Sequence, residues 1–149
     1  MNNDVYIIIP SRIGSTRLKN KPLIDLNGRS LIQRVLINAL NISKNSFVAT
    51  DSNLISKNIS NISNNILMTS KNHISGTDRI YEAATQLNLS KDTLIINLQG
   101  DEPFLPKELI DNMINDYNKN TCDVITASNK INKQDDLGNP NCVLVETDN

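Results

Sequence analysis

The feature that most constrains the fold of this chain is an alternation of short apolar runs with amphipathic helical patterns along its 149 residues. Residues 5–9 form a continuous apolar run, which is typical of a strand buried on both faces of a sheet. Further strands are predicted at residues 46–50, 66–69, 93–98, 124–127 and 143–145. This alternation predicts an α/β fold in which a mostly parallel sheet is flanked by helices.

The helices between these strands are indicated by their start signals. Ser30 begins one helix, and Gln33 completes a capping box with it. Thr77 is a predicted N-cap, and Pro106 is predicted at the first position of another helix. A weaker helix is expected across residues 53–62. Because crossovers between parallel strands are right-handed, a fold of this kind binds its ligands at the carboxyl ends of the strands.

The composition argues against several classes of protein. The formal net charge is −1 and 38% of the residues are hydrophobic, which fits a globular domain and not a nucleic-acid-binding protein, which would be basic. No apolar run approaches the ~20 residues that cross a bilayer, and no signal peptide is evident, so we expect a cytoplasmic protein without a membrane partner. Cys122 and Cys142 begin separate apolar runs, which predicts buried thiols and neither a disulfide nor a zinc site.

The segment at residues 10–23 carries the strongest chemical signal. It follows the first predicted strand and combines small residues with cations, namely Arg12, Gly14, Ser15, Thr16, Arg17, Lys19 and Lys21. Small residues let backbone N–H groups approach phosphate oxygens, and the cations supply charge-assisted hydrogen bonds. The pattern predicts a triphosphate-binding loop that is not a Walker A motif, with an ordinary solvated basic loop as the alternative.

A second segment, QGDEP at residues 99–103, follows the predicted strand at residues 93–98. An aspartate at the carboxyl end of a strand, here Asp101, is well placed to bind Mg²⁺ that is held mainly by substrate phosphates. Glu102 could assist this aspartate or simply face solvent. Taken alone, a strand-terminal aspartate is a weak indication of a metal site.

A third segment, SGTDR, begins a predicted helix. Ser75, Gly76 and Thr77 offer hydroxyl and backbone N–H groups that could bind a base edge or an anion. The alternative is structural, with Thr77 as a helix cap and Arg79 paired with a nearby carboxylate. His73 in the same loop is expected to be a solvated residue and not a general base. All three segments should open at one edge of the sheet.

Together the segments PSRIGSTRLKNKPLIDLNGRSLIQRVL, SGTDRI and INLQGDEP resemble, in order and spacing, the 3-deoxy-manno-octulosonate (Kdo) cytidylyltransferases, or CMP-Kdo synthetases. The similarity covers essentially the whole chain. The resemblance implies the Rossmann-like fold of the nucleotide-diphosphosugar transferases. It also implies an enzyme of lipopolysaccharide biosynthesis that transfers CMP from CTP to the anomeric hydroxyl of Kdo and releases pyrophosphate. Mg²⁺ is the implied cofactor, and the full-length family is expected to form homodimers.

The same resemblance assigns roles to individual residues. It implies that Arg12 and Lys21 hold the CTP phosphates and that Asp101 binds Mg²⁺, so these side chains would carry catalysis. The nucleotide-binding residues that it implies are Arg12, Ser15, Arg17, Lys21, Ser75, Gly76, Thr77 and Gln99. Ser75, Gly76 and Thr77 would lie near the cytosine and ribose, with Gln99 close by.

The chain differs from the family at individual positions and in length. Lys19 and Asn20 stand where the family usually has Pro-Gly, and Asp78 replaces a glutamate of some members. Family members continue well beyond this length, so residues 1–149 are interpreted as a single nucleotide-binding domain, the N-terminal part of a longer fold that is truncated here. The missing part would carry most Kdo contacts and a second metal-binding aspartate.

Two alternatives remain open at the level of the sequence. The chain could be a non-catalytic or inactive CTP-binding fragment. It could also be a nucleotidyltransferase for another acidic sugar such as an acylneuraminate, although the QGDEP segment argues against that sugar.

Overall fold

A computed structural model describes residues 5–14, 18–120, 122–131 and 143–145 of the chain. These residues belong to two compact units, which divide between Leu105 and Pro106. The first unit contains the sheet, its flanking helices and all three segments that the sequence marks as chemically important.

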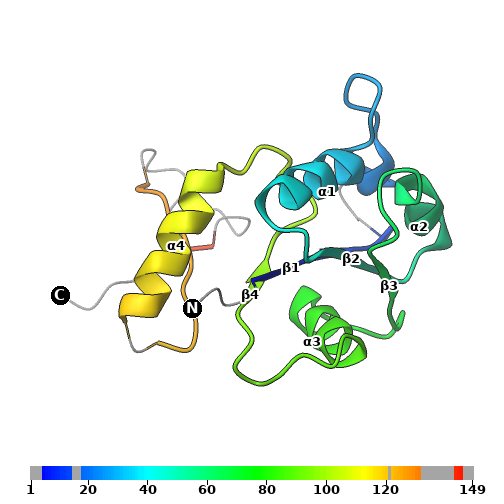
Figure 1. Cartoon of the computed structure of the whole chain (residues 1–149). Coiled ribbons are helices and arrows are strands. Elements are labelled where there is room, and N and C mark those ends of the chain that lie inside the picture. The colour runs from blue at the N-terminus through cyan, green and yellow to red at the C-terminus, as the bar shows by residue number, and fades with distance from the viewer. Residues whose placement is uncertain (1–4, 15–17, 121, 132–142, 146–149) are drawn as a thin grey trace. The chain divides into compact units, whose positions relative to one another are not determined.

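The first unit is built on a four-stranded sheet with the strand order β3-β2-β1-β4 (Figure 1). The strands are β1 (Tyr6–Ser11), β2 (Ser46–Thr50), β3 (Ile66–Met68) and β4 (Ile95–Asn97). Each pairing of neighbouring strands is parallel. The predicted α/β fold with a mostly parallel sheet is therefore confirmed.

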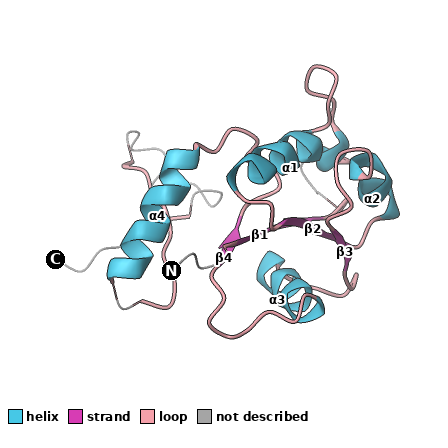
Figure 2. Ribbon diagram, viewed as in Figure 1, coloured by secondary structure: helices cyan, strands magenta, loops and turns pink. Residues whose placement is uncertain are grey.

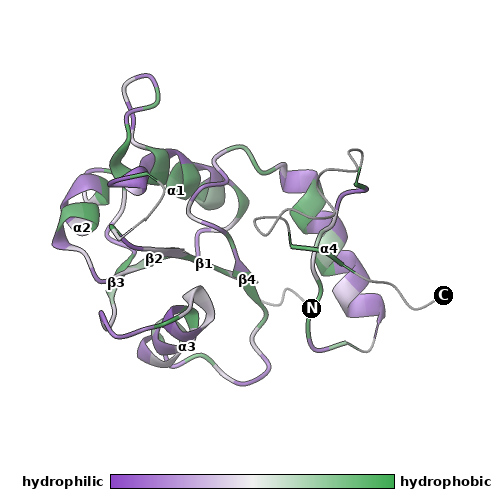
Figure 3. Ribbon diagram, turned by 180° about the vertical axis from the view of Figure 1, so that it is seen from behind, coloured by the Kyte–Doolittle hydropathy of each residue, from purple (hydrophilic) through white to green (hydrophobic). Residues whose placement is uncertain are grey.

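Helices cover both faces of this sheet (Figure 2). The helices α1 (Leu31–Ile42) and α2 (Asn53–Ile59) lie on one face, and α3 (Gly76–Gln86) lies on the other. Along each helix, hydrophilic and hydrophobic residues are interspersed, as expected for helices with one buried side (Figure 3).

The apolar run of β1 supplies the core on both faces. Ile7 and Ile9 are fully buried in the cluster that includes α1 and α2, whereas Ile8 is buried in the cluster formed with Ile80 and Ala83 of α3. Because successive side chains of a strand point to opposite faces, a strand covered on both sides must be apolar at every position. The prediction made for residues 5–9 is confirmed by this arrangement.

The N-terminal signals of the helices are confirmed at one position and corrected at another. Ser30 Oγ accepts a hydrogen bond from Gln33 N at 3.3 Å, and Gln33 Oε1 accepts one from Ser30 N at 3.0 Å, so the predicted capping box of α1 is present. The sequence predicts Pro106 as the first residue of a helix, but α4 (Lys107–Lys119) begins one residue later. Pro106 is its N-cap, because the backbone of Pro106 is extended with ψ 137°.

In the second unit, the predicted strands at residues 124–127 and 143–145 are wrong. These residues have no regular secondary structure, and Val124 and Val143 are 81% and 95% exposed. The preference of valine for strands reflects packing against neighbouring strands, so valine alone does not produce a strand without that packing.

The structure describes one of the two cysteines and shows the length and character of each helix. Cys122 has a free thiol and is half-buried, while Cys142 lies outside the described residues. Within the same part of the chain, no helix combines the length and apolar character needed to cross a membrane.

Candidate active site

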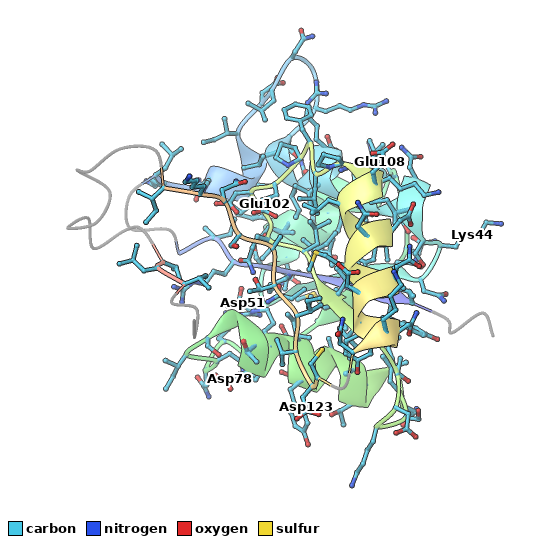
Figure 4. All side chains as sticks on the ribbon, turned by 90° about the vertical axis from the view of Figure 1, so that its left-hand side faces the viewer. Lys44, Asp51, Asp78, Glu102, Glu108 and Asp123 are labelled. Atoms are coloured by element: carbon cyan, nitrogen blue, oxygen red, sulfur yellow. The ribbon has the colours of Figure 1, made fainter. Side chains whose placement is uncertain are left out.

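The candidate site lies at the edge of the sheet where the strands have their carboxyl ends. Since the sheet is parallel, the segments that follow β1, β2, β3 and β4 all leave it at this edge. Figure 4 shows Asp51, Asp78 and Glu102 on this side of the molecule, with Lys44, which precedes β2, on the opposite side. The expectation that the three segments open at one edge is confirmed.

The structure brings Lys21 and Asp101 into direct contact at this edge. Lys21 Nζ donates a hydrogen bond to Asp101 Oδ2 and forms an ion pair with it, although 80 positions separate the two residues. The side chains are 37% and 48% exposed, so a ligand in solvent can reach both of them. A predicted phosphate-binding cation thus lies against the predicted metal ligand.

The local backbone fixes the position of Lys21. Lys21 begins the short 3-10 helix η1 (Lys21–Leu23), in which Pro22 is buried. Asn20 precedes it with φ 54° and ψ 32°, which is the left-handed conformation. Glycine adopts this conformation readily and asparagine tolerates it better than most residues. Asn20 can therefore adopt the left-handed conformation that precedes Lys21, at a position where the resembled family usually has glycine.

The position of Asp101 depends on a close approach between two backbone segments. A Cβ atom added at Gly100 would lie 3.1 Å from the carbonyl oxygen of Pro10 and 3.7 Å from Ser11 Oγ. Because a side chain at position 100 would crowd the end of β1, glycine allows the loop after β4 to lie against it. Ser11 Oγ is buried and has no hydrogen-bond partner among the residues that the structure describes. The sequence did not single out Ser11.

The beginning of α3 corrects the predicted cap. Ser75, and not Thr77, is the N-cap: Ser75 Oγ accepts a hydrogen bond from Asp78 N at 3.1 Å, and Asp78 accepts one from Ser75 N at 3.2 Å. Side-chain and then backbone hydrogen bonds from Ser75 hold the pKa of Asp78 below its ordinary value. A serine followed by an acidic residue at the third helical position satisfies two backbone donors, which Thr77 cannot do.

Arg79 is a buried residue at this edge of the sheet, and its contacts are within the fold. It is 3% exposed, donates to Thr69 Oγ1, and donates to Asp51 Oδ2 at 3.2 Å. Thr69 follows β3 and Asp51 follows β2, so Arg79 connects two strand ends to the first turns of α3. The structural interpretation of Arg79, in which it pairs with a nearby carboxylate, is confirmed.

The expectation that His73 is solvated is wrong. Its Nε2 contacts Glu82 Oε2 of α3, and the two side chains are partly buried, with 20% and 30% of their surfaces exposed. Glu82 Oε2 also accepts a hydrogen bond from Ser70 N at 2.8 Å, and Oε1 accepts one from Gln86 Nε2 at 3.1 Å. The hydrogen bond from Ser70, followed by that from His73, lowers the pKa of Glu82 below its ordinary value of 4.5. These contacts attach the loop between β3 and α3 to the helix.

We expect Glu82 to make the stability of the fold depend on pH in the acidic range. Because the pKa of Glu82 is lower in the folded state, its contribution is fully present above the unfolded value of 4.5 and is lost as the pH falls through the folded pKa. Glu82→Gln should reduce this dependence by about 0.2–1 kcal/mol, since the contacts are partly solvated. Urea unfolding measured from neutral pH down to pH ~3 provides the test. Glu102→Gln, an exposed position, is the control, and an unaltered pH profile for Glu82→Gln would contradict the expectation.

The remaining predicted site residues lie in the loops and at the beginning of α3 at the same edge. Arg12, Gly76 and Thr77 are exposed. Gln99 is also exposed, and its Nε2 donates to Asn97 Oδ1 at 3.0 Å. Ser15 and Arg17 lie outside the described residues. The structure therefore joins Lys21 and Asp101 directly. Arg12 and Gln99 lie in loops of the same edge, and Ser75, Gly76 and Thr77 lie at the beginning of α3.

The acidic residues of this edge limit the kind of metal site that it can form. Within the described ranges, no three histidine, cysteine or acidic side chains are grouped as a metal cage would require. A cation here would have one protein carboxylate, that of Asp101, and would need further oxygen ligands from a bound substrate. Mg²⁺ is commonly held in that way, by one or two carboxylates together with substrate phosphates.

A parallel sheet flanked by helices, with a cation and a carboxylate at its carboxyl edge, is typical of an enzyme that binds nucleotide phosphates. The family model described as cytidylyltransferase matches residues 6–149, and the chain belongs to that family. The family assignment covers all three segments of the candidate site.

Curated relatives carry a more specific name. The chain is 41% identical over 141 residues to the 3-deoxy-manno-octulosonate cytidylyltransferase of Hahella chejuensis, covering 93% of this chain and 55% of the relative. It is 44% identical over 149 residues to the enzyme of that name from Thermodesulfovibrio yellowstonii, covering 95% of this chain and 58% of the relative. The resemblance inferred from the sequence is thus confirmed, and the chain spans a little over half the length of these relatives.

Solved structures agree with the fold. A structure of CMP:2-keto-3-deoxy-manno-octonic acid synthetase complexed with CTP has a TM-score of 0.70 and 33% identity, covering 77% of this chain and 47% of that one. A cytidylyltransferase from Leptospira borgpetersenii has a TM-score of 0.63 at 24% identity, covering 78% of this chain and 50% of the other. The second similarity concerns the fold alone.

Proposed function

We propose that this chain forms the nucleotide-binding part of a 3-deoxy-manno-octulosonate cytidylyltransferase, which transfers CMP from CTP to the anomeric hydroxyl of Kdo. The contact between Lys21 and Asp101 carries the proposal, because a lysine that would bind phosphate lies beside a carboxylate that suits Mg²⁺. The names of the relatives support Kdo as the sugar and give no support to an acylneuraminate.

The cations of the loop after β1 would bind the triphosphate. Arg12 is exposed and can offer its guanidinium as a fork, while Lys21 supplies a point charge. Ser15 and Arg17 would add contacts from the same loop. Ser75, Gly76, Thr77 and Gln99 would hold the cytosine and ribose. The backbone N–H groups of Gly76 and Thr77, which the capping box does not use, would be available to the nucleotide.

Asp101 is the residue that would hold Mg²⁺. Its carboxylate is partly exposed and lies at the carboxyl end of β4, next to the cation that would bind the phosphates. Bound there with the phosphates, Mg²⁺ would neutralise the negative charge that develops as pyrophosphate leaves. The donor set fits this ion, because a single carboxylate suffices where substrate oxygens complete the coordination.

The proposed reaction needs no covalent intermediate on the protein. The anomeric oxygen of Kdo forms a bond with the α-phosphorus of CTP while the bond to the β-phosphate oxygen breaks, so that CMP-Kdo and pyrophosphate result. The hydroxyl proton is released to solvent or to the leaving group. Lys21 and Arg12 would stabilise the charge on the departing pyrophosphate, so the protein acts by positioning and electrostatics.

We extend the proposal to the biological setting of the complete enzyme. A supply of CMP-Kdo serves lipopolysaccharide biosynthesis, for which CTP in the cytoplasm is the nucleotide source. The full-length protein is proposed to be a homodimer. Residues 1–149 are proposed to form its nucleotide-binding domain, with the remaining Kdo contacts supplied by the part that the relatives have in addition.

The test is a calorimetric titration of the full 149-residue chain with CTP, with and without Mg²⁺, and with ATP as the control nucleotide. We expect Mg²⁺-dependent binding of CTP at least about tenfold tighter than that of ATP, a difference of about 1.4 kcal/mol. Equal binding of both nucleotides would contradict the assignment of the base, and binding of neither would contradict the nucleotide site in this chain. A panel of acidic sugars assayed with CTP on the longer protein would then test Kdo as the acceptor.

A further inference from the structure

Lys21 and Asp101 are assigned to different ligands, yet in the structure they neutralise each other. Lys21 would bind the triphosphate and Asp101 would bind Mg²⁺, whereas here Nζ of the lysine lies against Oδ2 of the aspartate. A cation that approaches this oxygen meets the ammonium group of Lys21. A phosphate that approaches Nζ meets the carboxylate of Asp101.

We propose that the Lys21–Asp101 ion pair is an internal counter-ion lock, which makes the divalent cation and the triphosphate bind cooperatively. This inference rests on the proposed function, and it concerns the order in which the two ligands occupy that site. Mg²⁺ alone must displace Lys21 from the carboxylate. When the triphosphate has attracted Lys21 away, the carboxylate is free and the cation binds without that cost.

The cooperativity follows from a shared contact. Each ligand can bind fully only after the same ion pair has opened, so the ligand that binds first opens it and the second gains affinity. By linkage, the cation must strengthen triphosphate binding by the same factor as the triphosphate strengthens cation binding. An ion pair at a partly exposed position contributes enough to change an affinity by about two- to fivefold.

The fold positions this pair and leaves Lys19, a neighbouring cation of the same loop, without a contact to Asp101 among the described residues. The left-handed backbone of Asn20 and the buried ring of Pro22 set the direction of the chain at Lys21, and Gly100 brings the loop of Asp101 against the end of β1. Lys19 lies two positions away in the same loop and is exposed, and no contact with Asp101 is found for it in the described part of the chain. Removing Lys19 therefore changes the charge of the loop without opening the pair.

The experiment measures the affinity of the full chain for Mg²⁺ alone, with no nucleotide present. The amide resonances of Gly100 and Glu102, on either side of Asp101, are followed by NMR during a Mg²⁺ titration at low ionic strength, where screening is weak. We expect Lys21→Met to bind Mg²⁺ about two- to fivefold more tightly than the wild type. Lys19→Met, which removes the same charge from the same loop, should change the affinity much less, and Asp101→Asn should abolish the response.

Three results would overturn the proposal: an unchanged Mg²⁺ affinity in Lys21→Met, an equal gain in Lys19→Met, or no Mg²⁺ response in either wild type or Lys21→Met. Unaltered amide spectra away from the loop establish that each variant is folded. The proposed function is tested separately by CTP binding to the wild type. If the wild type binds CTP with Mg²⁺ but Lys21→Met leaves the Mg²⁺ affinity unchanged, the proposed function stands and the counter-ion lock is contradicted. If Lys21→Met shows the Mg²⁺ effect but the wild type binds ATP as tightly as CTP, the counter-ion lock stands and the proposed cytidylyltransferase function is contradicted.

Discussion

Asp101→Asn is expected to lower the Mg²⁺-dependent affinity of the chain for CTP by at least about 100-fold. Loss of a residue that merely orients a metal ligand costs about 10- to 100-fold, and Asp101 would be the ligand itself. The substitution preserves the shape of the side chain and removes its charge, so the amide cannot replace the carboxylate as an anionic ligand. Calorimetric titration with CTP in the presence of Mg²⁺ measures the effect.

Glu102→Gln is the matched control for this experiment. It makes the same chemical change at the next residue, whose side chain is exposed and forms none of the ion pairs found among the described residues. We expect its affinity for CTP to stay within about twofold of the wild type, as is usual for a surface substitution. The Asp101→Asn variant should lose nothing when CTP is titrated in EDTA, because no cation is then involved. Equal losses with and without Mg²⁺ would contradict the role of Asp101 as a metal ligand.

The layers of the fold could be predicted because they depend on local patterns. The apolar run of β1 indicates burial on both faces, and the structure buries Ile7 and Ile9 on one face and Ile8 on the other. The capping box at Ser30 is equally local, since both of its hydrogen bonds join residues within one helical turn. Periodicity and capping chemistry thus determine the elements, and the parallel sheet then brings the three segments to one edge.

The pairs that connect these segments could not be predicted from the same patterns. The Lys21–Asp101 contact joins positions 80 apart, and the Arg79–Asp51 contact joins positions 28 apart. Each depends on which strands are neighbours and on how far a loop extends, which no local periodicity describes. His73 was misjudged for the same reason, because Glu82 lies on the next element and shields it.

The error at the beginning of α3 has a different origin. Thr77 and Ser75 are both good caps by residue type, so propensity alone does not distinguish them. The distinguishing signal is Asp78, which returns a hydrogen bond to the backbone of Ser75. A reciprocal pair satisfies two of the N–H groups that a helix leaves free, and this favours the earlier start.

Arg79→Met is expected to destabilise the chain by about 3–5 kcal/mol, which is the usual cost of removing one partner of a buried ion pair. Arg79 is 3% exposed and pairs with Asp51, which is itself only 18% exposed, so the substitution would leave a shielded carboxylate without its cation. The hydroxyl of Thr69 would lose its donor as well. The free energy of unfolding, measured by urea denaturation at neutral pH, would show the loss.

Arg29→Met provides the comparison, because it makes the same change at an exposed arginine and should alter the stability by no more than about 0.5 kcal/mol. A loss below about 1 kcal/mol in Arg79→Met would mean that the pair behaves like one at the surface. If the larger loss is found, the double variant Arg79→Met/Asp51→Asn should recover part of it, since the isolated charge is then gone. That recovery would separate the electrostatic role of Arg79 from its packing. It would also show that the ends of β2 and β3 are held to α3 by a charge pair inside the fold, beside the residues at the beginning of α3 that are proposed to bind the nucleotide.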